Sequence, residues 1–250
     1  MLRDFTTDVT GWFFLAGALM LWGGRVLLPR RVGMFFQSDD FPAIGARLHL
    51  WLWLYRVHLF GVVVSALAVA ALAALVANQP AVRILVWPGA AVAVAGLIVG
   101  AVGSAFYYHF GVWGALQTRK TPHAAGDLVE SLHLPTHYVT CLVRFGRVFC
   151  GLGLAMLAAG LLRGEVLPWW VGGGAAGLGV AAMALTMLWP DNWALYTPVF
   201  HLQALWLAAT GAYLLCATAH APCTALAWAR KDLVFVGQVH RCRLLRWARA

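Results

Sequence analysis

The chain has 250 residues, of which 62% are hydrophobic and only 11% are charged, with a formal net charge of +9. Globular domains carry roughly a quarter charged residues, so one soluble core cannot bury this much apolar surface, and a membrane protein is predicted. In a soluble protein the positive charge would suggest a nucleic-acid partner. Here Lys and Arg lie mainly in short segments between apolar runs, where they contact anionic lipid. The expected partners are therefore the lipid bilayer and other membrane subunits, with no nucleic acid.

Six apolar segments follow one another along the chain, and each is long enough to cross a hydrocarbon core about 30 Å thick. They cover residues 11–28, 50–77, 88–110, 138–162, 168–189 and 196–219. The sequence therefore predicts an all-α fold, a polytopic transmembrane helix bundle of about six spans. We expect residues 1–229 to form this transmembrane domain and residues 230–250 to form a basic amphipathic tail on the membrane surface.

Prolines and glycines mark where these helices end and where they pack closely. A proline lacks a backbone N–H and is tolerated best at a helix end, so five prolines are expected at boundaries. They are Pro29, Pro80, Pro88, Pro168 and Pro190. The five glycines within residues 171–179 lie inside the fifth segment, where small residues allow close helix packing.

The basic residues between segments predict the orientation. Arg30, Arg31, Arg47, Arg119 and Lys120 fall on one side of the bundle, while the other side has Arg3, Arg83 and Arg163. By the positive-inside rule the first side is cytoplasmic, which predicts a multi-pass inner-membrane protein. Six crossings place the tail of residues 230–250 on the opposite side, although it carries six Lys and Arg residues, and this conflicts with the rule.

A weak internal similarity suggests three helical hairpins. Leu-His-Leu occurs at residues 48–50 and again at 132–134, and Phe-His-Leu occurs at 200–202. The spacing around these markers differs among the hairpins, and apolar helices match one another easily. Duplication of one hairpin and chance similarity both remain open.

Three histidines are expected at one depth inside the membrane. At a rise of about 1.5 Å per residue, His58, His109 and His201 each lie roughly 10 to 15 Å from the cytoplasmic surface. Polar groups inside a membrane are costly and usually functional, and imidazoles on facing helices are common ligands of haem and metal ions. The alternative is that each histidine makes one hydrogen bond between helices.

Two arginines follow histidines by two helical turns and extend this candidate site. Arg56 and Arg144 share a helix face with His49 and His137, respectively, and either a haem propionate or a quinone carbonyl would suit their guanidinium groups. The alternative is that they reach toward lipid headgroups, and Arg147 is expected to do so.

A second candidate site lies in the segment of residues 121–137, which we expect to be a solvated loop. His133 and His137 lie close to the acidic residues Asp127 and Glu130 there, and His49 with Asp39 and Asp40 lies in the preceding cytoplasmic segment. Histidine and carboxylate ligands together suit a transition metal. If residues 127–133 instead form a short interfacial helix, Glu130 and His133 share one face at i, i+3.

Near the C-terminus, Cys216, His220 and Cys223 are spaced along one helix face and offer ligands suited to Zn(II) or Cu(I). Pro222 interrupts that face, and packing of small polarizable side chains is the simpler interpretation.

These patterns favour an integral inner-membrane protein that binds haem b or a transition metal through His58, His109 and His201. Such a protein would serve electron transfer or belong to a redox complex. The rival hypotheses are a small non-redox permease, whose polar residues line a path near mid-membrane, and a structural or assembly subunit of a membrane complex.

Overall fold

The computed structural model describes residues 2–27, 36–77, 80–121, 123, 125–190 and 192–219. Every regular element in these ranges is an α-helix, and six of the helices are long and apolar enough to cross a membrane. The helices are α1 (Leu2–Val26), α2 (Asp40–Ala46), α3 (Leu48–Val76), α4 (Pro80–Lys120), α5 (Ala125–Gly164), α6 (Trp169–Leu188) and α7 (Trp193–Ala219). The prediction of an all-α, multi-pass membrane protein with six spans is confirmed.

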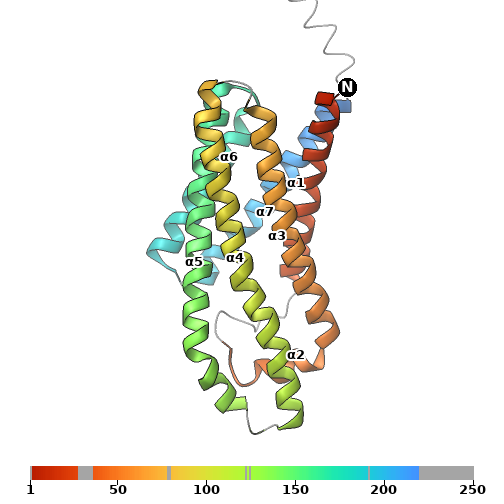
Figure 1. The fold of residues 1–250 in the computed structure, drawn as a ribbon, viewed down its shortest axis with the longest axis vertical. Coiled ribbons are helices and arrows are strands. Elements are labelled where there is room, and N and C mark those ends of the chain that lie inside the picture. The colour runs from red at the N-terminus through yellow and green to blue at the C-terminus, as the bar shows by residue number, and fades with distance from the viewer. Residues whose placement is uncertain are drawn as a thin grey trace, which may run out of the picture.

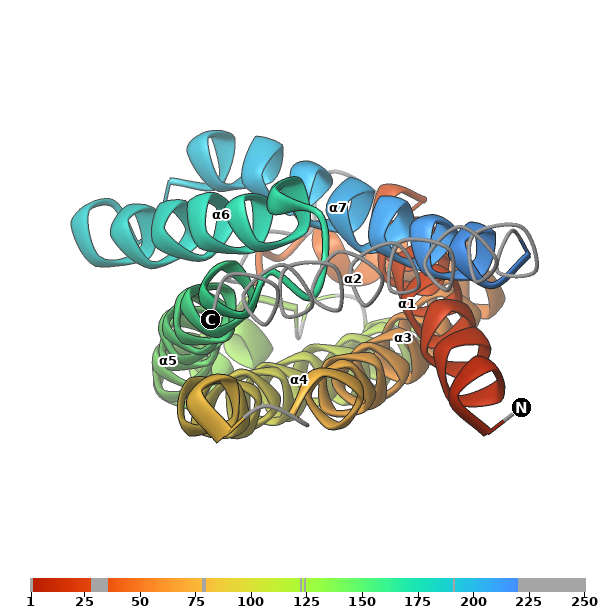
Figure 2. The ribbon, with the colours of Figure 1, turned by 90° about the horizontal axis from the view of Figure 1, so that it is seen from above.

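Six helices form a closed ring, in which each contacts the next in the order α1, α3, α4, α5, α6, α7 and back to α1. We call this arrangement the helix ring. Figure 2 shows α1, α3, α4 and α5 as a curved layer whose open side is covered by α6 and α7. Every span contacts the next one along the chain, so α1 with α3, α4 with α5, and α6 with α7 are contacting pairs, as three helical hairpins require, but α3 with α4 and α5 with α6 are contacting pairs too.

The helices α4 and α5 are much longer than a membrane crossing requires. They contain 41 and 40 residues, which corresponds to about 60 Å each at 1.5 Å per residue, twice the thickness of the hydrocarbon core. Pro88 lies inside α4, so its prediction as a boundary residue was wrong. Pro80 and Pro168 do lie at helix starts, and Pro190 follows the end of α6.

The segment of residues 121–137 is mostly helical, so the prediction of a solvated loop was wrong. The helix α5 begins at Ala125 and continues without a break into the membrane span. Its first turns bury Leu128, Leu132 and Thr136, which recur every four residues and therefore share one face. Hydropathy averaging missed this helix because polar residues, among them Glu130, Ser131 and His133, lie between them.

The buried face of early α5 packs against a second hydrophobic core at the α2 end of the molecule. This α2 core consists of Phe36, Phe41, Ile44, Trp51, Tyr55, Tyr107, Ala115, Leu128, Leu132 and Val139. Figure 1 shows α2 beside the last turns of α4, well below α6 and α7. Arg119 of α4 donates a hydrogen bond from Nη2 to the Gly45 carbonyl of α2, at 3.2 Å. The α2 core thus organises the part of the bundle that extends past the helix ring.

Glycines bring three helices of the ring into backbone contact. A Cβ atom at Gly96 of α4 would meet the backbone of Gly146 and Cys150 of α5, and one at Gly179 of α6 would lie 2.6 Å from the Gly151 carbonyl oxygen of α5. The close packing predicted for the glycines of residues 171–179 is therefore confirmed at Gly179.

The described basic residues are divided between the two ends of the bundle as the sequence indicated. Arg47, Arg119 and Lys120 lie at the α2 end, where α3 begins and α4 ends. Arg83 lies in the first turn of α4 and Arg163 in the last turn of α5, both at the opposite end.

Candidate ligand chamber between the helices

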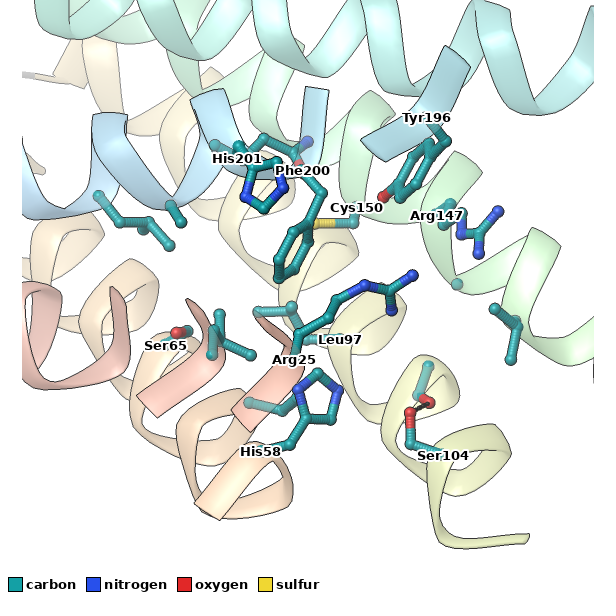
Figure 3. A pocket seen from close by; sticks show the side chains of 18 of the residues that line it. Arg25, His58, Ser65, Leu97, Ser104, Arg147, Cys150, Tyr196, Phe200 and His201 are labelled. Atoms are coloured by element: carbon teal, nitrogen blue, oxygen red, sulfur yellow. Dashed lines mark hydrogen bonds between the residues drawn. The ribbon is translucent and has the colours of Figure 1, made fainter. Parts of the chain in front are cut away.

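A cavity of about 850 Å³ lies inside the helix ring and is lined by residues of α1, α3, α4, α5 and α7. We call it the chamber, and Figure 3 shows part of its lining. Pockets that bind small molecules or cofactors usually measure about 300 to 1,000 Å³, so this volume suits one ligand of that size. The chamber lies within the apolar spans of all five helices.

The chamber is polar at the end nearer α2 and apolar at the other. Because α3, α5 and α7 run away from the α2 end while α1 and α4 run toward it (Figure 1), the position of each residue in its helix gives its level. The α2 end has Arg25, Tyr107, Arg147 and Tyr196. The far end has Val69 of α3, Leu97 of α4, Leu154 of α5 and Leu207 of α7. A ligand that fits both ends has a polar head and an apolar body.

Two arginines on different helices supply the positive charge of the polar end. Arg25 lies in the last turn of α1, and its guanidinium carbon stands 5.0 Å from the centre of the Phe200 ring. Arg147 of α5 stands 4.1 Å from the centre of the Tyr196 ring. Both rings belong to α7, so cation–π contacts help to orient the two guanidinium groups. No Asp or Glu is found among the described residues that line the chamber, whose charge is therefore positive.

Two of the three histidines predicted to share a site line the chamber. They are His58 of α3 and His201 of α7. Trp22 of α1 donates a hydrogen bond from Nε1 to Nδ1 of His201, at 3.1 Å. An indole N–H only donates, so Nδ1 of His201 carries no proton and the neutral ring is protonated on Nε2. In Figure 3 the Phe200 ring and the Arg25 side chain lie between the two imidazoles.

Two polar atoms of α3 are buried in the wall of the chamber. Nδ1 of His58 and Oγ of Ser65 have no hydrogen-bond partner among the described residues. Both residues line the chamber.

The structure places the other predicted cofactor-binding residues outside the described lining. His109 is exposed on α4, with its ring centre 5.2 Å from that of Phe110. Arg56 is exposed on α3 and donates from Nε to the Tyr108 hydroxyl at 3.3 Å, and Arg144 is partly buried on α5. Neither arginine is among the described residues that line the chamber.

The predicted metal ligands are only partly brought together. His133 and His137 lie one turn apart on α5, with 3.3 Å between their Nε2 atoms. His49 lies in the first turn of α3 and is exposed. Within the described ranges, no group of three or more His, Cys, Asp or Glu side chains is arranged to hold a metal ion.

Of the C-terminal motif at Cys216, His220 and Cys223, only the exposed Cys216 is described. His220, Cys223 and the tail of residues 230–250 lie outside the described residues.

Sequence reasoning missed the two arginines that face the chamber. Arg25 was not singled out, and Arg147 was expected to reach the headgroups, whereas it lines the chamber beside Tyr196. Both lie inside predicted apolar spans, and a guanidinium group within such a span was the signal that could have identified them.

Comparison with known proteins does not assign the chain to a family. The chain matches no protein-family model, and neither a curated protein nor a solved structure is significantly similar to it.

Proposed function

We propose that this multi-pass membrane protein binds an amphipathic anion in the chamber, as a small permease or ligand-carrying subunit would. The observation that carries the proposal is the pairing of Arg25 and Arg147 at one end of a chamber whose other end is apolar. A carboxylate, phosphate or sulfonate head would accept charge-assisted hydrogen bonds from the two guanidinium groups. The apolar body would then lie beside Val69, Leu97 and Leu154.

The proposed membrane and the proposed partners are supported by the distribution of basic residues and by the small surface outside the spans. We propose the inner membrane of a cell, with the end that carries Arg47, Arg119 and Lys120 in the cytoplasm, because cytoplasmic loops are enriched in Lys and Arg. Association with other membrane subunits is part of the proposal, because the described loops are short and present little surface of their own.

The test uses two ligands with the same apolar chain and different heads. Dodecyl phosphate and dodecanol are added to the purified chain in a neutral maltoside detergent, and the shift of the unfolding temperature reports binding. We expect dodecyl phosphate to stabilise the protein. Arg25→Gln and Arg147→Gln should each weaken phosphate binding by roughly tenfold or more, the loss expected for one charge-assisted hydrogen bond.

Dodecanol and Arg163→Gln provide the controls. Arg163 is exposed in the last turn of α5, at the opposite end of the bundle from Arg25 and Arg147, and its replacement should leave both ligands unaffected. Unchanged dodecanol binding in the chamber variants shows that they are folded. Equal binding of dodecyl phosphate by wild type and both chamber variants would reject the proposal.

Haem b is a second candidate ligand, because His58 and His201 line the same chamber as the two arginines. Its propionates would meet Arg25 and Arg147, and electron transfer would be the resulting function. With the Trp22 bond in place, Nε2 of His201 carries its proton and would not bind iron, so His58 would be the histidine that holds it. An absorption spectrum decides this candidate: a Soret band that His58→Ala removes supports haem, and a spectrum without one rejects it.

A further inference from the structure

A pair of exposed histidines lies on α5, far from the chamber. His133 and His137 lie at i and i+4 on α5, on one face of the helix, and both side chains are exposed. Their Nε2 atoms are 3.3 Å apart, and their ring planes meet at 73°. The two imidazole nitrogens therefore lie within hydrogen-bond distance of each other beside the helix.

The separation of the two nitrogens fits a tetrahedral metal ion. Zinc binds imidazole nitrogen at about 2.0 to 2.1 Å, so two ligands at the tetrahedral angle have nitrogens roughly 3.3 to 3.4 Å apart. Ligands at a right angle, as in square-planar or octahedral sites, would stand about 2.8 to 3.0 Å apart at the same bond length. The observed 3.3 Å, at which the two rings can also share a hydrogen bond, is compatible with the tetrahedral spacing.

The pair is accessible from water, and the neighbouring face of the helix is buried against the rest of the protein. His133 lies 31 residues before the end of α5 at Gly164, or about 46 Å along the axis, which is beyond a hydrocarbon core of about 30 Å. Leu132 and Thr136, each next to one of the two histidines, are buried against the α2 core and fix the helix face. Glu130, exposed one turn before His133, adds negative charge nearby.

We propose that His133 and His137 form a two-histidine binding site for a tetrahedral transition-metal ion, Zn(II) in the first instance, on the extramembrane part of α5. Both ligands come from one helix, so binding the second is intramolecular and strengthens the first. The remaining two coordination positions of the metal are filled by water or by carboxylate oxygen. This site is independent of the ligand proposed for the chamber.

Metal titration of the full chain tests the site. The protein is purified through a tag that contains no histidine, and Zn(II) is titrated in competition with a chromophoric indicator. Wild type should bind one equivalent more than His133→Ala or His137→Ala, with an affinity at that site about a hundredfold higher than either variant retains. Titration with Co(II) should give the intense visible bands of tetrahedral coordination, which the two variants lose.

Matched histidines and a chamber variant make the result specific. His49→Ala and His123→Ala replace exposed histidines outside the pair and should bind zinc as wild type does. Arg25→Gln should also retain the site, which separates this test from that of the chamber. Equal zinc stoichiometry in wild type and the double variant of His133 and His137 would overturn the proposal, and so would loss of the same site in His49→Ala.

Discussion

At the scale of single residues, the sequence shows which polar side chains fall within the spans but not the direction in which they point. The rise per residue placed His58, His109 and His201 at one level, yet only His58 and His201 line the chamber. Each residue turns a helix face by about 100°, so an unknown helix rotation decides which side chains point inward. Arg147 lines the chamber and Arg144 does not, although they are three residues apart on α5.

Asp40 carries a prediction about pH, because its carboxyl group lies outside the membrane spans and is only 3% exposed. Burial raises the pKa of Asp40, while the hydrogen bond that the Gln37 backbone N–H donates to Oδ2 at 2.8 Å lowers it in part. A raised pKa in the folded state means that the protonated form is favoured by folding. The stability it contributes is present at low pH and is lost as the pH rises through the folded pKa.

Asp40→Asn should therefore raise the unfolding temperature at pH 7, and this gain should shrink toward pH 4. The amide keeps an oxygen that accepts the Gln37 hydrogen bond but never ionises. Thermal unfolding of wild type and variant at several pH values measures the effect. Asp39→Asn, at an exposed neighbouring position, is the control and should show a smaller change. A gain that stays constant with pH would contradict the assignment to ionisation of Asp40.

At the scale of elements, the apolar parts of all six spans were predictable, but the amphipathic start of α5 was not. Membrane helices are uniformly apolar and give a strong hydropathy signal. The first turns of α5 are apolar only along one stripe, because they pack on the α2 core while their other sides face water. The helix α2, with seven residues, is too short to give the hydropathy signal of a membrane span, and it was therefore not expected.

Leu132 tests whether early α5 packs as a helix. Its side chain is 5% exposed, whereas that of Leu134, two residues later, is 79% exposed. Leu132→Ala should lower the free energy of unfolding by about 2 to 5 kcal/mol, as expected for a buried leucine, while Leu134→Ala should change it little. Chemical denaturation in detergent compares the two variants. Similar small effects of both would restore the solvated-loop interpretation.

Gly179 tests the contact between α5 and α6. A side chain there would meet the Gly151 carbonyl of α5, whereas a Cβ at Gly177 on the same helix would meet nothing within 4 Å. Gly179→Leu should therefore destabilise the fold by about 1 to 3 kcal/mol, the usual cost of overpacking. Gly177→Leu is the matched control with the same gain in volume and helix propensity. Unfolding temperatures of the two variants should differ clearly, and equal values would show that α6 packs differently.

At the scale of the whole molecule, the hairpins followed from the order of the spans, but closure of the ring did not. Consecutive antiparallel helices usually pack together, which gives the three hairpin contacts. The ring closes only because α1 and α7 also meet, with Gly11 against Gly211 and Phe14 edge-on to Trp206 at 6.0 Å. Nothing in hydropathy marks such a distant pair. The chamber depends on this closure, since its lining is drawn from both α1 and α7.

The ends of the bundle give a prediction for the orientation of the whole molecule. Thr121, after α4, and Glu165, after α5, are both exposed and lie at opposite ends. We expect a single cysteine at Thr121 to face the cytoplasm, because that end carries Arg47, Arg119 and Lys120, and a single cysteine at Glu165 to face outward.

Labelling of intact cells with a membrane-impermeant maleimide distinguishes the two orientations, in a background whose native cysteines are replaced by serine. Glu165→Cys should react in intact cells, and Thr121→Cys only after the membrane is permeabilised. The structure puts the start of α1 and the end of α7 at the same end as Glu165 (Figure 1). The reverse labelling pattern would mean that the six basic residues of 230–250 outweigh the loops. Since the positive-inside rule is strongest for short loops near the spans, the loops at the α2 end should decide the orientation.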